Sequence, residues 1–330
     1  MFVLVVGASA LLAGTATGPV RTAPAVTCKA GPSTQPGRDG DPPLPPNRRP
    51  EVAEKDVRKY VPATVEQIEA NRRKGREWAK QAAAFAPGLH QIETPHFVIY
   101  SAWPASDDKP VSQVCERMYA AMCRQFGIPA GENIWAGKCV VYIFPKKQQF
   151  RRFCTEVYKR GNPESAGFCG WESNGFVFIV MGPCDSRKWF YELLVHEATH
   201  GFIFRYRTNR NVPSWVHEGL AEYMAATLVP GAHAGKKYVS ATKEAIRKNR
   251  PVAPVLEDVK LDSFDYGVAQ SFVRFLIARN SKGFVKFVEL LKDGVSEADA
   301  LKQAYGLTRE QFIREWTRAA ARAVAPKRGS

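Results

Sequence analysis

Two histidines and a glutamate, in the motif His196-Glu197-Ala198-Thr199-His200, are the residues of this chain best suited to chemistry. On a helix, residues four apart share one face and lie a turn apart. His196 and His200 can then hold a single metal ion, while Glu197, about 100° around the helix, reaches a water on its open side. A catalytic zinc site needs a third protein ligand, so the pair is incomplete by itself.

A second helical segment, residues 213–223, supplies the candidate third ligand. Seventeen residues separate His200 from Glu218, enough for a helix end, a loop and a return onto the first helix. We therefore expect Glu218 to complete the site. Glu222, one turn further on, would face the same way and accept the outer N–H of His196.

Two alternatives stay open for this segment. His217 competes with Glu218 as a ligand, although adjacent helix positions point in different directions. A Glu-x-x-x-Glu pair is also common on a solvated helix face, where it holds no metal.

The elements that must position these residues form two halves. Strands are expected at 96–100 and 138–144, helices at 111–126 and 148–158, and a hairpin at 167–171 and 176–181. Everything after residue 186 has a helical pattern. The sequence therefore predicts an α+β fold in which a small β-rich half precedes a helical half.

The N-terminal part predicts export. Residues 2–13 are apolar and Ala23-Pro24-Ala25 offers a small-x-small cleavage pattern, so residues 1–25 are interpreted as a signal peptide. Residues 26–52 are a linker rich in proline and glycine, and residues 53–88 an accessory helical segment. The main domain is expected at 89–325, in a secreted or cell-envelope protein without a membrane span in its mature chain.

Composition and cysteine usage narrow the classes further. A chain of 330 residues, 45% hydrophobic and 24% charged, is neither wholly disordered nor collagen-like. Six cysteines fall in one stretch without a CxxC pair, which favours a disulfide framework over reduced core cysteines. They are Cys115, Cys123, Cys139, Cys154, Cys169 and Cys184. The net charge of +15 would attract an anionic envelope polymer, but no motif indicates specific nucleic-acid binding.

The two helical segments resemble the gluzincin metallopeptidases. H-E-x-x-H followed by Trp215-Val216-His217-Glu218-Gly219-Leu220-Ala221-Glu222-Tyr223 is similar to a mostly uncharacterised family of secreted bacterial proteins with a peptidase-MA-like domain. The likeness to aminopeptidase N is more distant. The resemblance implies a thermolysin-like helical half, with His196, His200 and Glu218 as zinc ligands and Glu197 as general base and acid.

A third segment, which begins Tyr266-Gly267-Val268-Ala269, is similar to the stretch whose tyrosine hydrogen-bonds the oxyanion in aminopeptidase N relatives. The resemblance thus implies a catalytic role for Tyr266, whereas the alternative is the start of an ordinary amphipathic helix. The implied function is zinc-dependent hydrolysis of a peptide or protein, by an endopeptidase or an exopeptidase. The strand at 176–181 is expected to offer backbone groups to an extended peptide. The competing hypothesis is an inactive gluzincin-fold binding or scaffold protein of the cell envelope.

Overall fold

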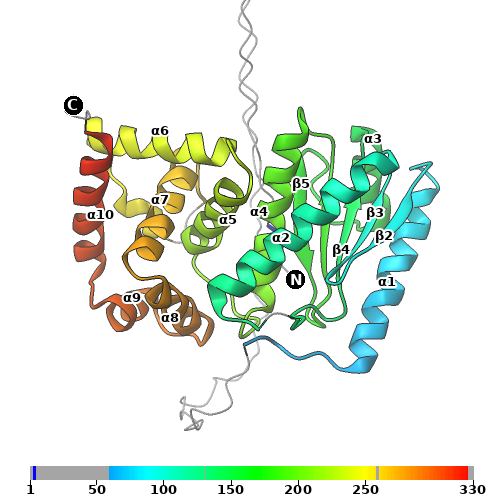
Figure 1. The fold of residues 1–330 in the computed structure, drawn as a ribbon, viewed down its shortest axis with the longest axis horizontal. Coiled ribbons are helices and arrows are strands. Elements are labelled where there is room, and N and C mark those ends of the chain that lie inside the picture. Colours follow the sequence, from blue (N-terminus) through cyan, green and yellow to red (C-terminus); the bar gives the residue numbers. More distant parts are fainter. Residues whose placement is uncertain (1–2, 5–58, 130, 258–259, 326–330) are drawn as a thin grey trace, which may run out of the picture. The chain divides into compact units, whose positions relative to one another are not determined.

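The computed structural model describes residues 3–4, 59–129, 131–257 and 260–325 (Figure 1). Within them the predicted α+β fold is confirmed, with a small sheet followed by a run of helices. Apart from the two-residue strand β1 (Val3–Leu4), the predicted signal peptide and linker lie outside the described residues, as do residues 53–58.

One mixed sheet runs in the order β1-β5-β6-β4-β3-β2. Its strands are β2 (His90–Glu93), β3 (Phe97–Ser101), β4 (Cys139–Ile143), β5 (Gly167–Trp171) and β6 (Val177–Met181). The predicted hairpin is present, since β5 and β6 pair antiparallel from Gly167↔Met181 to Trp171↔Val177. The prediction that the strand at 176–181 offers backbone groups to an extended peptide is wrong, because β6 lies between β5 and β4. Its uninterrupted apolar run is typical of a strand buried on both faces.

The two faces of the sheet carry separate layers of helices (Figure 1). Successive strand residues point to opposite faces, so on β4 Val140 and Tyr142 join the core beneath α1 (Val65–Ala83) and α3 (Lys147–Arg152). Val141 and Ile143 join the core shared with α2 (Asp108–Phe126) and α4 (Arg187–Arg205). The accessory helix α1 thus covers one face, with the Trp78 ring centre 5.0 Å from that of Phe178.

The helical half follows α4 and packs around it. It comprises α5 (Ser214–Leu228), α6 (His233–Arg247), α7 (Ser263–Arg279), α8 (Ser281–Lys292), α9 (Glu297–Tyr305) and α10 (Arg309–Val324). α5 lies between α4 and α7, and α6 packs on α7. No helix among the described residues has both the length and the apolar character needed to cross a bilayer.

The C-terminal end of α4 is fixed by neighbours from both halves. The buried ammonium of Lys292 donates to the carbonyls of Ile203 (2.8 Å) and Arg210 (2.5 Å), and burial lowers its pKa to about 7. The backbone N–H of Val61 donates to the carbonyl of Arg205 at 3.1 Å. These bonds tie α8 and the segment before α1 to the helix that carries both histidines.

Gly219 sets the distance between α5 and α7. A Cβ at this position would meet the carbonyl group of Ala269, with its carbon at 2.7 Å, and the Val273 side chain at 2.9 Å. The two helix backbones therefore approach more closely than any other residue permits.

We predict that Gly219→Ala lowers the free energy of unfolding by about 1–3 kcal/mol, because the added methyl forces α5 and α7 apart. Gly235→Ala on α6 is the matched control. Its Cβ would have a single neighbour, Ala226, at 4.0 Å, so we expect unchanged or slightly higher stability. Chemical denaturation of both variants measures the difference, and equal effects would contradict this account of the α5–α7 contact.

Candidate metal centre

α4 carries both histidines and is buried on almost every side. It begins after Ser186, whose hydroxyl accepts a hydrogen bond from the backbone N–H of Trp189 at 3.1 Å. Strands β5 and β6, α2 and α5 all pack against it. The side chains of His196 and His200 are 5% and 0% exposed, and their ring centres lie 4.7 Å apart.

The structure brings Glu218 of α5 to both histidines. Its Oε2 lies 3.2 Å from Nε2 of His196 and 3.5 Å from Nε2 of His200. One ligand atom from each of the three residues falls within 4.8 Å of the others. The ligands predicted from the spacing therefore converge at one point, from two helices.

The converging atoms lack other partners. Nε2 of His196, Nε2 of His200 and both carboxylate oxygens of Glu218 are buried without a hydrogen bond. Buried polar atoms are nearly always paired, and a metal ion between the three residues would supply a partner for these atoms. Two imidazole nitrogens and one carboxylate are the donor set of His₂Glu catalytic zinc sites. The residues fit a zinc ion with one position left for water or substrate.

The electrostatics of the group favour a cation. Burial disfavours the charged form of His196, but the carboxylates of Glu218 and Glu222 outweigh it and raise the pKa of His196 to about 9. Burial likewise opposes ionisation of Glu218, yet His200 and His196 hold the pKa of this carboxyl well below its usual range. An ionised carboxylate thus stands at the centre of the cluster.

Glu197 lies beside the ligands without joining them. Its Oε2 accepts a hydrogen bond from the backbone N–H of Cys169 on β5 at 2.8 Å, and its Oε1 is buried and unpaired. Burial raises the pKa of Glu197, an effect that His196 and His200 reduce but do not cancel. One oxygen is thus fixed by the sheet, while the other is available to accept a proton.

Glu222 stands on the expected side of His196 but does not make the expected hydrogen bond. Its Oε1 is 3.9 Å from Nδ1 of His196, too far for a hydrogen bond, and 2.9 Å from the ammonium of Lys237 on α6. The prediction that Glu222 accepts the outer N–H of His196 is therefore wrong in this structure. Lys237 was not anticipated, because nothing in the sequence pattern of α6 marks it.

Tyr266 lies in the first turn of α7, which Asp262 caps by accepting hydrogen bonds from the backbone N–H groups of Phe264 and Asp265. Burial is the main cause that raises the pKa of its phenol, followed by the nearby carboxylates of Glu218 and Glu222. The phenol therefore keeps its proton and can act as a donor. The structure places it next to the metal-ligand cluster rather than in a purely apolar helix contact.

The ring of His217, the alternative ligand, packs against the ring of His200. Its ring centre is 4.2 Å from that of His200 and 6.3 Å from that of Trp171. Burial and the proximity of His200 lower its pKa well below the usual range, so it stays neutral. It is not part of the cluster that could hold a metal.

The expected disulfide framework is absent from the described part of the chain, where all six clustered cysteines are free thiols. Five are buried, and burial raises the pKa of Cys115, Cys139 and Cys169. Buried thiols of this kind pack as small apolar side chains. Cys169 contributes to the site through its backbone, not its sulfur.

Comparison with models of known protein families and with curated proteins finds no match to this chain.

We predict that the wild-type chain binds about one zinc ion, and that His196→Ala, His200→Ala and Glu218→Ala each lose most of it. Glu192→Gln is the matched control, since Glu192 is another buried glutamate of α4 and bonds instead to the N-terminus of α6. It should bind zinc as wild type does, as should His217→Ala. Metal analysis after dialysis measures the content, and full retention by Glu218→Ala would assign the third ligand to another residue.

Proposed function

We propose that this chain is a zinc-dependent metallopeptidase. The observation that carries the proposal is the buried convergence of His196, His200 and Glu218, whose facing nitrogen and oxygen atoms are unsatisfied. The unpaired oxygen of Glu197 adds a proton acceptor beside the same point. The resemblance of the two helical segments to gluzincins supports this assignment.

The chain's own residues have distinct parts in the proposed hydrolysis. A zinc ion held by the three ligands would polarise a peptide carbonyl and lower the pKa of a water towards about 7. Glu197 takes the proton from the attacking water through Oε1 and later gives it to the leaving amine. Tyr266 donates a hydrogen bond from its phenol to the developing oxyanion. Burial of the site strengthens that hydrogen bond.

The position of β5 supports an extended peptide as substrate. Its residue Cys169 holds Glu197 through the backbone N–H, so the strand runs directly past the proposed base. Val3–Leu4 pairs with β5 antiparallel, at Val3↔Gly170 and Leu4↔Cys169. This edge of the sheet therefore accepts an extended segment, in the manner of strand addition.

The proposed setting is outside the cytoplasm or in the cell envelope, on the strength of the apolar start and cleavage pattern at residues 1–25. The excess of basic residues would hold such an enzyme near anionic envelope polymers.

We predict that Glu197→Gln keeps the zinc content and melting curve of the wild type but hydrolyses at least about 10²-fold more slowly, because the amide cannot accept a proton. The assay is cleavage of unfolded casein or a quenched peptide library, with and without a chelator. If zinc-loaded wild type cuts no peptide, a binding or scaffold protein replaces the peptidase. Equal cleavage by Glu197→Gln would assign the activity to another site.

Tyr266→Phe tests the phenol separately. We predict normal zinc binding and a fall in kcat larger than any change in KM, because the phenol acts only on the transition state. Steady-state kinetics on one quenched peptide gives both values. An unchanged kcat would leave Tyr266 as a packing residue of α7.

A further inference from the structure

Lys237 is the cation that links the two sides of the candidate site. Its ammonium lies 2.9 Å from Oε1 of Glu222 and 5.4 Å from the centre of the Tyr266 ring. About a third of the Lys237 side chain is exposed, whereas the Glu222 side chain is almost fully buried. One ammonium thus contacts both the carboxylate behind a metal ligand and the face of the proposed oxyanion donor.

The backbone of α6 is held close enough for this contact by Gly267, the residue after Tyr266. A Cβ on Gly267 would meet the carbonyl oxygen of Lys237 at 2.9 Å and Cβ of Ala241 at 2.6 Å. Because glycine allows this approach, Lys237 reaches across the start of α7 towards Glu222 on α5. The ion pair therefore connects α5 and α6, and the contact of the ammonium with the Tyr266 ring adds α7.

The distances show which partner holds Glu222. Oε1 is at hydrogen-bonding distance from Lys237 but 3.9 Å from Nδ1 of His196. A carboxylate bonded to the outer nitrogen of a metal-ligating histidine makes that histidine a stronger ligand. Here the carboxylate is 3.9 Å from that nitrogen, beyond hydrogen-bonding distance, and is paired with the ammonium instead.

We propose that Lys237 is a positioning residue that keeps Glu222 from forming a hydrogen bond with His196. A metal ion at the site would then bind less tightly and act as a stronger Lewis acid. The charge of Lys237 also offsets the negative charge that Glu222 would otherwise direct at the metal. The inference rests on the proposed function for its kinetic consequence, and on the metal site alone for its effect on affinity.

The test compares Lys237→Met, which keeps a long unbranched side chain but not its charge, with Lys237→Arg, which keeps both charge and reach. Lys237→Met should bind Zn²⁺ about tenfold more tightly, because Glu222 is then free to bond His196. Its kcat should fall about tenfold with KM within about twofold of wild type, since the metal becomes a weaker Lewis acid. Lys237→Arg should keep the zinc affinity and kcat close to those of wild type.

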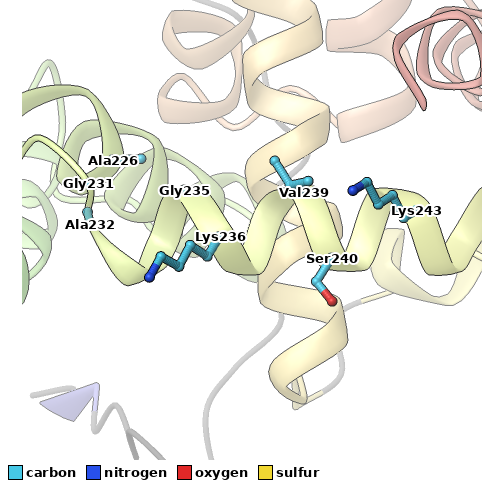
Figure 2. Close-up of a pocket in the computed structure, with 8 residues that line it drawn as sticks. All are labelled: Ala226, Gly231, Ala232, Gly235, Lys236, Val239, Ser240 and Lys243. Carbon is cyan, nitrogen blue, oxygen red and sulfur yellow. The ribbon is translucent and has the colours of Figure 1, made fainter. Parts of the chain in front are cut away.

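Lys236→Met is the matched control. Lys236 is the neighbouring residue, and with Val239 and Lys243 it lines a hollow of about 460 Å³ on the exposed face of α6. Figure 2 shows these side chains on the helix. No metal ligand lines that hollow. This variant should match wild type in zinc affinity and in kcat.

Zinc affinity is measured on the full chain by competition with a chromogenic chelator, without substrate. Weaker or unchanged zinc binding by Lys237→Met overturns the proposal, because a merely structural lysine would loosen the site when removed. If Lys237→Met does not fold, Lys237→Gln must show the same tightening. A wild type that binds zinc but cuts no peptide refutes the peptidase and leaves the affinity test intact.

Discussion

Two buried histidines and three buried carboxylates meet where α4 packs against α5, and removing these groups from water is costly unless each finds a partner. Cys169 pairs one oxygen of Glu197 and Lys237 pairs Glu222, but His196, His200 and Glu218 face one another with unpaired atoms. A divalent cation bound at that point would satisfy the remaining atoms together.

The close packing is achieved by glycines that directly follow functional residues. Gly201 follows His200, and its Cβ would come within 2.6 Å of the Val177 side chain on β6. Gly219 does the same for α5 and α7, and Gly267 for α7 and α6. At these three positions the helix backbone lies directly against a neighbouring element. This close contact fixes the direction of the functional side chain that precedes each glycine.

Local patterns in the sequence were enough to predict the elements and the convergence of His196, His200 and Glu218. The i, i+4 histidines and the return to Glu218 depend on helix geometry alone, and the strands at 96–100 and 138–144 follow from short apolar runs. Contacts between residues far apart in the sequence were not predictable. The order of the strands put β6 inside the sheet, and the ion pair of Glu222 with Lys237 depends on how α6 packs on α7. The cysteines lacked any signal that separates packing from pairing, since both favour burial.

The most direct test of the metal centre is a crystal structure of the zinc-loaded chain with diffraction data collected on both sides of the zinc absorption edge. The account predicts one anomalous peak at about 2.0–2.2 Å from Nε2 of His196, Nε2 of His200 and a carboxylate oxygen of Glu218. A zinc peak ligated by His217 or by a cysteine sulfur at about 2.3 Å, with Glu218 turned away, would contradict it.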